Sequence, residues 1–224
     1  MPHLLPLFPL GAVLFPGMLM PLHVFEDRYR RLLIDRDGAE PIFGVVLTSH
    51  GREVGDRPEI HPVGSAATLV AAGRYPDGRS DIIVRGGRRF RVQPGSGDWS
   101  RGYLVAEVEW LPEHLGASPE GDELDVLTAQ AATSYERFIA AFEQATGADL
   151  PREPLPTGAA DLVWAICSRV PLDTWERQRL LEHPTTRDRL LDLAGILRRE
   201  RDLLVTTGVG GAAVARPGGS FTPN

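Results

Sequence analysis

Four arginines near the middle of the chain are the side chains best suited to contact a charged ligand. Guanidinium groups bind phosphates through paired hydrogen bonds. These four flank Gly86-Gly87, a dipeptide that favours a two-residue hairpin, from which they could contact phosphates. Strand alternation, however, places Phe90 and the arginines beside it on opposite faces, as in an ordinary half-buried strand with a solvated side. A net charge of −6 also opposes nonspecific nucleic-acid binding, so RNA binding is the alternative interpretation and nucleic acid an unexpected partner. The four residues are Arg85, Arg88, Arg89 and Arg91.

Five large apolar side chains form the second candidate group. Thioethers and aromatic rings contact varied partners with little geometric demand, so such a group is suited to extended or unfolded polypeptide segments. Ordinary core packing is the competing interpretation for each of them. The five residues are Phe15, Met18, Met20, Trp99 and Trp110.

Nucleophilic, metal and cofactor chemistry finds little support in the residue pattern. All 24 basic residues are arginines, which excludes a phosphate-loop lysine, a Schiff base and a Ser-Lys dyad. The serines lack the spacing of a nucleophile elbow, and the histidines lack a recognised zinc spacing. Cys167 lies on the apolar face of a predicted helix, which favours a small core residue over a nucleophile. We therefore expect no catalytic residue, no metal, no cofactor and no enzymatic activity.

A cytoplasmic location is expected from the cysteine count and from the first 25 residues. A single cysteine cannot form an internal disulfide, which argues against a secreted disulfide framework. The segment Met1 to Phe25 has no Asp, Glu or Arg, but its prolines oppose a membrane helix, and no basic region precedes the apolar stretch as in a signal peptide. We expect no membrane association.

The residue composition and patterning of the chain change near residue 112. Residues 1–112 hold 13 arginines and 13 acidic residues, whereas residues 113–224 hold 11 arginines and 17 acidic residues. The first part is interrupted by Pro, Gly and Asp, and the second contains long stretches with helical periodicity. This predicts an α+β protein with a β-rich lobe at 1–112, a helical lobe at 113–207 and a disordered tail at 208–224.

The β-rich lobe is expected to hold short strands and one helix. The helix spans Glu26 to Asp35, with Tyr29, Leu32 and Leu33 on its apolar face and Arg28 among the residues available to water. Pro76-Asp77-Gly78 predicts a turn, because proline fixes its own φ angle and glycine adopts a positive φ without steric cost. The predicted strands lie near residues 4–8, 18–25, 41–48, 60–64, 66–74, 81–85, 88–93 and 102–110.

Four helices are expected in the second lobe, where short connections favour a packed bundle. The first runs from about Leu124 to Ala145 and ends at Gly147, and the second is capped by Thr157 and ends before Pro171. The third begins at Asp173 or Thr174, with Trp175 among its apolar residues, and ends at Pro184. The fourth begins near Thr185 or Thr186 and carries a leucine stripe through Leu204.

Several ordered motifs resemble one known family. Leu5 to Pro16 reads LPLFPLGAVLFP and Met20 to Leu32 reads MPLHVFEDRYRRL, and together they resemble the opening of the Lon protease N-terminal substrate-binding domain. Asp27 departs from that pattern, which often has proline there. The remaining landmarks occur in the expected order at Gly64–Val70, Pro76–Arg79, Gly87–Val92, Val170–Asp173, Gln178–Glu182 and Arg189–Leu191.

The resemblance covers residues 4 to about 204 and implies more than the residue pattern does. It implies a PUA-like β-barrel or sheet lobe with one short helix, followed by a four-helix bundle lobe. It further implies a stand-alone member without the AAA+ and peptidase modules, which binds unfolded or apolar polypeptide segments and works beside a separate protease or chaperone. The first hypothesis is therefore a non-catalytic protein-binding domain, and the RNA-binding module is the alternative.

Overall fold

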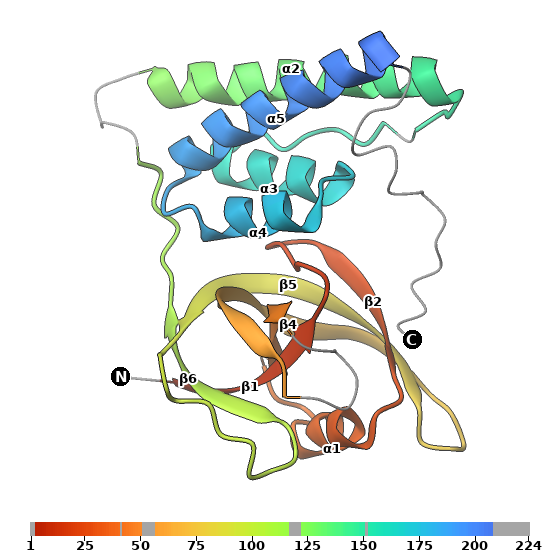
Figure 1. Ribbon diagram of the computed structural model, residues 1–224, viewed down its shortest axis with the longest axis vertical. Helices are drawn as coiled ribbons and strands as arrows, with labels where there is room; N and C mark the ends of the chain where they lie inside the picture. The colour runs from red at the N-terminus through yellow and green to blue at the C-terminus, as the bar shows by residue number, and fades with distance from the viewer. Residues whose placement is uncertain (1–2, 41, 51–56, 117–121, 151, 208–224) are drawn as a thin grey trace. The chain divides into compact units, whose positions relative to one another are not determined.

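The computed structural model describes residues 3–40, 42–50, 57–116, 122–150 and 152–207. They fall into two compact units, one within Met1–Pro112 and the other within Glu113–Gly219 (Figure 1). Strands dominate the first unit and helices the second, which gives the α+β class that the sequence predicts. The tail expected at 208–224 lies outside the described residues. Among the helices of the described ranges, none combines the length and the apolar composition that crossing a bilayer requires.

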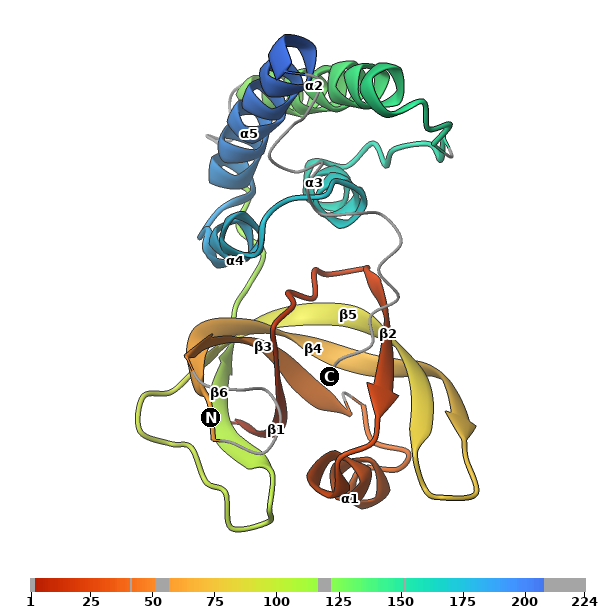
Figure 2. The same ribbon diagram turned by 45° about the vertical axis from the view of Figure 1, so that its right-hand side comes forward.

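Six strands in the described part of the first unit form one sheet. Its order is β2-β5-β4-β3-β1-β6, and an additional pairing of β5 with β6 closes β5, β4, β3, β1 and β6 into a ring. The β1–β3 pair is parallel and the other pairs are antiparallel. Figure 2 shows the strands curving around this ring, with β2 beside it. The strands are β1 (His3–Leu10), β2 (Leu19–Val24), β3 (Phe43–His50), β4 (Glu59–Arg74), β5 (Ser80–Val92) and β6 (Leu104–Trp110).

The hairpin predicted at Gly86-Gly87 is wrong, because both glycines lie inside the continuous strand β5. Gly86 donates a backbone hydrogen bond to the carbonyl of Met18 at 2.9 Å and accepts one from the amide of Gly17 at 2.8 Å. A Cβ at position 86 would lie 2.0 Å from the carbonyl oxygen of Phe15. This glycine therefore permits close approach of two backbone segments and does not turn the chain.

The prediction of two strands separated at Ser65 is also wrong, because one continuous strand passes through that residue. Residues 60–64 and 66–74 both belong to β4, and its ladder with β5 continues through two register shifts, between Ser65 and Ala67 and between Leu69 and Ala71. The turn at Pro76-Asp77-Gly78, in contrast, is confirmed as the link between β4 and β5. Gly78 has a φ of 86° and donates to the carbonyl of Tyr75 at 2.9 Å.

Two clusters of buried side chains hold the first unit together. One is centred on Phe90, whose ring lies against Gly44 and Gly64, where an added Cβ would come within 2.5 and 2.9 Å of the ring. The other lies beneath α1 (Asp27–Asp35), where the rings of Phe8 and Tyr29 stack with centroids 3.8 Å apart. Glycine at these two sheet positions makes room for the large aromatic ring.

The helix α1 agrees with the prediction from the sequence except at Arg28. Tyr29 and Leu32 are buried, as their spacing predicts. Arg28 was expected in water, but its side chain is only 14% exposed and forms a 2.9 Å ion pair with Glu26. Its guanidinium also lies 4.7 Å from the ring centroid of Tyr29, so the aliphatic stem and the charge both find partners beside the helix.

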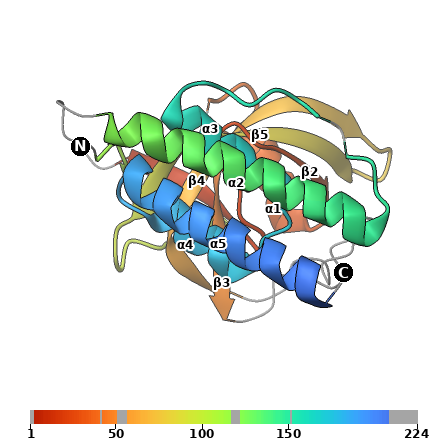
Figure 3. The same ribbon diagram turned by 90° about the horizontal axis from the view of Figure 1, so that it is seen from above.

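Four helices in the described part of the second unit match the predicted segments. The long helices α2 and α5 lie side by side (Figure 3), and α3 packs against both of them. Gly147 ends α2 with a φ of 70°, as expected, and Asp173 caps α4 by accepting from the amide of Glu176 at 2.8 Å. The helices are α2 (Glu123–Thr146), α3 (Ala159–Arg169), α4 (Thr174–Glu182) and α5 (Thr186–Thr207).

Two details of the helical prediction are wrong. The N-cap of α3 is Gly158 and not Thr157, and it has no side chain to bond the first turn. Trp175 was expected among the apolar contacts of α4, but it is 66% exposed. It occupies the first turn of a nine-residue helix whose buried positions are later in the sequence, where Leu180 and Leu181 pack.

A buried arginine connects α5 to α3 and to the first residue of the helical unit. Arg189 on α5 is fully buried, and its guanidinium lies 4.2 Å from the ring centroid of Trp164. It donates to the carbonyl of His183 at 3.1 Å, to the hydroxyl of Thr186 at 3.2 Å and to the carboxylate of Glu113. These partners distribute the charge over oxygen and aromatic acceptors, as a buried guanidinium requires.

Candidate functional site

The second half of β4 extends away from the ring and forms a three-stranded arm with β5 and β2. Pro21, Ile83 and Ala71 are register partners across these strands, so their side chains share one face. Figure 2 shows β5 between β4 and β2 in this arm, with β4 on the outer side. β3 pairs with β4 only as far as Ala67, so the ladder of the arm has no strand beyond β4 in the described structure.

The arm carries a contiguous set of exposed apolar side chains, here named the apolar ribbon. Leu19 and Val70 are each 49% exposed, and Leu69 and Ile83 are each 39% exposed. Adjacent exposed apolar residues on paired strands are more informative than scattered ones, because such patches mark contact surfaces. The apolar ribbon consists of Leu19, Pro21, Val70, Ala71 and Ile83, whereas Leu69 is the register partner of buried Val84 and belongs to the other face.

Alternation along β2 and β5 produces the apolar ribbon. Met20 and Val84 are register partners and point into the core, where they are 7% and 0% exposed. Leu19 and Ile83 therefore point to the opposite face, since successive side chains of a strand alternate. The ribbon has a firm base, because its strands are fixed from beneath by buried neighbours.

A polar cluster lies at the hairpin end of the arm. Asp81 accepts from the hydroxyl of Tyr75, and the Nδ1 atom of His23 lies 2.6 Å from the other carboxylate oxygen. The hydrogen bonds that Asp81 accepts from Tyr75 and His23 hold its pKa below the usual range, and the same carboxylate raises the pKa of Tyr75. Tyr75 and Asp81 are exposed and His23 is half-buried, and their contacts connect β2, β5 and the end of β4. The cluster therefore stabilises the arm.

The five apolar residues singled out in the sequence occupy different places. Phe15 and Met20 are 0% and 7% exposed, so they do not contact a partner directly and can contribute only by packing beneath β2. Met18 is half-buried against the cluster beneath α1 and precedes Leu19 of the apolar ribbon. The two tryptophans are half-buried against the cluster around Phe90, so the five side chains do not share one surface patch.

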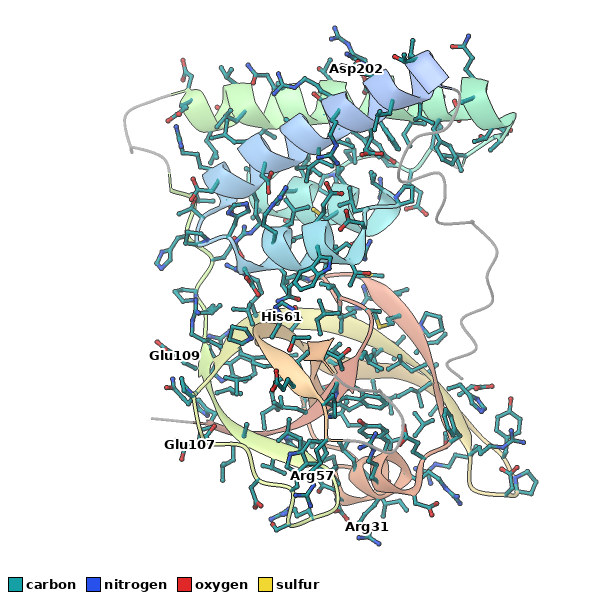
Figure 4. All side chains as sticks on the ribbon, viewed as in Figure 1. Arg31, Arg57, His61, Glu107, Glu109 and Asp202 are labelled. Atoms are coloured by element: carbon teal, nitrogen blue, oxygen red, sulfur yellow. The ribbon has the colours of Figure 1, made fainter. Side chains whose placement is uncertain are left out.

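Both tryptophans have arginine neighbours. The guanidinium carbons of Arg28 and Arg57 lie 6.0 and 5.8 Å from the ring centroid of Trp99. Arg57 is labelled in Figure 4, near α1. Arg88 lies 5.1 Å from the ring centroid of Trp110. Cation–π contacts of this kind cover part of each ring and reduce the surface available to a partner.

The arginine cluster is divided by the strand that carries it. Arg85, Arg88 and Arg91 are exposed, whereas Arg89 is only 3% exposed, which corrects the expectation that it lies on a solvated hairpin. Arg91 is the register partner of Glu109 on β6. Figure 4 shows Glu109 and Glu107 projecting from the outer side of β6. These carboxylates neutralise part of the positive field that RNA phosphates would need.

The thiol and the possible metal ligands within the described ranges give no sign of a reactive site. Cys167 is fully buried in α3, and burial raises the pKa of its thiol to about 12, which opposes thiolate formation. No group of three or more His, Cys, Asp or Glu side chains within those ranges is arranged to hold a metal ion.

Sequence reasoning predicted the strands of the arm but missed the residues of the apolar ribbon. The signal was present in the segment 68–73, which reads TLVAAG and has neither charge nor proline. Alternation alone cannot show that both faces of such a segment are open. The apolar residues of that segment could be expected to be covered, and the structure shows that they are not.

Comparisons with known proteins agree with the fold and with the motifs. The family described as the ATP-dependent protease La (LON) substrate-binding domain matches residues 4–199. The Lon protease 2 of Syntrophobacter fumaroxidans is 29% identical over 212 residues, which cover 91% of this chain and 25% of that protein. The Lon protease 2 of Desulfotalea psychrophila is 30% identical over 210 residues, covering 91% of this chain and 26% of its own length. The chain thus spans about a quarter of the length of these relatives.

Solved structures show the same architecture. The Lon N-terminal domain protein from Xanthomonas campestris is 29% identical with a TM-score of 0.60, covering 86% of this chain and 98% of that one. The N-terminal domain of Mycobacterium avium complex Lon protease gives the same TM-score at 20% identity, covering 88% and 98%, and supports the fold alone. From the family match over residues 4–199 and these relatives, the chain belongs to the Lon substrate-binding domain family.

Proposed function

We propose that this chain binds exposed apolar segments of unfolded polypeptides through the apolar ribbon and catalyses no reaction itself. Membership of a substrate-binding family supports a role in binding polypeptide substrates, and the matched relatives are proteases. The bound chains would then pass to a separate protease or chaperone in the cytoplasm.

The observation that carries the proposal is the exposure of apolar side chains on three paired strands. Leu19, Ile83 and Val70 keep 39–49% of their surface in contact with water, although each belongs to a strand that also packs against the core. Covering such a surface with another apolar chain releases water at roughly 25 cal/mol per Å². A non-directional contact of this type accepts many sequences, which suits unfolded substrates.

A titration with a labelled, permanently denatured model protein tests this function. Fluorescence anisotropy should show saturable binding in the micromolar range or weaker, because the ribbon is small. Ile83→Asp should weaken binding about tenfold or more, since it places a charge among the apolar contacts. Val205→Asp is the matched control, because Val205 is 73% exposed on α5 and lies outside the ribbon.

The outcomes are distinct. If the denatured protein does not bind at high concentration, or if the Ile83 and Val205 variants weaken binding equally, the ribbon is not the binding surface. Incubation with casein, followed by electrophoresis, tests the absence of catalysis. Cleavage that persists through further purification would contradict it.

A further inference from the structure

The outer edge of β4 in the arm offers main-chain hydrogen-bonding groups in addition to apolar side chains. Gly86 bonds to the β2 side of β5 through both its N–H and its C=O. Main-chain groups of a strand alternate in direction, so those of Ile83 and Asp81 point to β4, where their register partners are Ala71 and Gly73. The hydrogen bond from Tyr75 to Arg79 continues the same alternation.

The intervening residues of β4 must then point away from β5. Ala72 and Arg74 direct their N–H and C=O groups to the open edge, two residues apart, as an added strand requires. Within the described residues, no hydrogen bond is recorded from the main chain of residues 69–74 to a strand beyond β4.

The two edges of the arm differ in composition. Pro21 lies within β2, and a proline in an edge strand limits pairing with another chain. The segment Leu69–Gly73 on β4 has no proline and no charge. The β4 edge is therefore the one that can accept a strand, and its regular ladder runs from Ala71 to Arg74, beyond the register shift between Leu69 and Ala71.

We propose that the edge of β4 at residues 69–74 binds an extended apolar segment of a polypeptide by β-strand addition. This inference rests on the proposed function and specifies its mode. Main-chain hydrogen bonds to Ala72 and Arg74 provide affinity that does not depend on sequence, and the apolar ribbon provides the preference for apolar side chains.

Charge complementarity defines the segment further. Arg74 lies at one end of the open edge, and Arg85, the register partner of Thr68, lies near the other, and both are exposed. Asp37 approaches Arg74 at 3.9 Å, but both side chains are at least 70% exposed and such a pair is weak. The matching segment is apolar in its centre and carries carboxylates toward its ends.

A second copy of this chain is a less suitable occupant. Six residues of strand give an edge of roughly 20 Å. Two such edges, pairing side by side as parts of folded domains, bury much less than the roughly 1,200–2,000 Å² of a stable interface. A flexible segment can both pair with the edge and cover the side chains of the ribbon.

Two fluorescein-labelled peptides test the mode with the full chain. The first is a ten-residue peptide with six central Val, Leu and Thr residues and an aspartate at each end. The second has the same sequence with alternate amides N-methylated along one edge, which removes donors and blocks strand pairing. The first peptide should bind, and methylation should raise its Kd about tenfold or more.

Two variants of the protein test the same hydrogen bonds by changing the β4 edge instead of the peptide. Ala72→Pro removes the outward N–H without removing a bond to β5, and should raise the Kd of the first peptide about tenfold or more. Ala72→Val keeps the N–H and should leave the Kd within about threefold or lower it. Amide exchange should show new protection at residues 72 and 74 on binding, whereas 71 and 73 are protected already.

Each outcome has a separate meaning. If neither peptide nor denatured protein binds, the proposed function fails. If both peptides bind equally to the folded protein, polypeptide binding survives and strand addition is wrong. If peptide binding is absent while sedimentation shows a dimer that Ala72→Pro dissociates, the occupant of the edge is a second copy, and the proposal is overturned. Should Ala72→Pro not fold, the two peptides and the amide exchange decide the question.

Discussion

The buried guanidinium of Arg189 donates a hydrogen bond to the carboxylate of Glu113, which lies 76 positions earlier in the chain. Arg189 is fully buried, whereas the side chain of Glu113 is 33% exposed. The pair therefore fixes the first residues of the helical unit to α5 while the carboxylate keeps some contact with water. Thr186 donates to the same carboxylate at 2.9 Å.

Replacing Arg189 with methionine should reduce the free energy of unfolding by about 3 kcal/mol. The change removes the donor to Glu113 and to the carbonyl of His183, and it deletes a cation above Trp164. Urea denaturation followed by circular dichroism measures the loss. Arg198→Met on the same helix is the control, because Arg198 is exposed. Equal stability of the two variants would show that the buried guanidinium contributes little.

Gly86 and Gly87 provide a second pair of matched substitutions. A Cβ at Gly86 would lie 2.0 Å from a backbone oxygen, whereas a Cβ at Gly87 would meet its nearest atom at 3.6 Å. Gly86→Ala should reduce the free energy of unfolding by about 3 kcal/mol. Gly87→Ala should change it by less than about 1 kcal/mol. Thermal unfolding of both variants, compared with the unchanged chain, tests whether backbone approach is the reason for glycine at position 86. A neutral Gly86→Ala would refute it.

The thiol of Cys167 should be inert in the folded protein. Burial raises its pKa to about 12, so the thiolate fraction at pH 8 is far below that of an ordinary thiol with a pKa of about 8.5. Because the chain has a single cysteine, mass spectrometry after treatment with iodoacetamide reports on this group alone. Alkylation should be very slow without denaturant and complete with it. Rapid alkylation of the native protein would show that α3 opens readily.

Acid should weaken the arm through Asp81. Its pKa in the folded protein is lowered by hydrogen bonds that it accepts from Tyr75 and His23, so its carboxylate contributes stability above the unfolded pKa of about 3.9. That contribution is lost as the pH falls through the lowered folded value. Asp81→Asn should therefore be less stable than the unchanged chain at pH 7, and the difference should shrink below about pH 4.

Urea denaturation from pH 7 to pH 2.5 measures this dependence on pH. The control is Asp149→Asn, a change of an exposed aspartate in the helical unit. A difference between Asp81→Asn and the unchanged chain that stays constant with pH would mean that ionisation of Asp81 does not stabilise the arm.

Helices were more predictable from the sequence than strands, for a physical reason. The ends of α2 and α4 follow from local chemistry at Gly147 and Asp173, which need only their neighbours. The continuity of β5 depends on Gly86 meeting Phe15, a residue distant in the sequence. A glycine that permits close approach has the same local appearance as a glycine that turns the chain.

The candidate site was less predictable for a related reason. Alternation correctly distinguishes buried Met20 from its neighbours but does not show which face another layer covers. Arg89 is buried and Ile83 is exposed, although residue type alone suggests the reverse. Exposure of this kind depends on where β4 leaves the ring, which is a property of the whole sheet.

The pairing of β1 with β6 also determines when the ring can form during synthesis. Residues His3 to Leu7 have their antiparallel partners at Leu104 to Val108, so the first strand stays incomplete until about a hundred further residues have been made. At about 5–20 residues per second, this delay lasts roughly five to twenty seconds. In that interval the leucines of β1 have no closed interior to enter. The emerging chain is then, for a short time, an apolar polypeptide of the kind that the completed protein is proposed to hold.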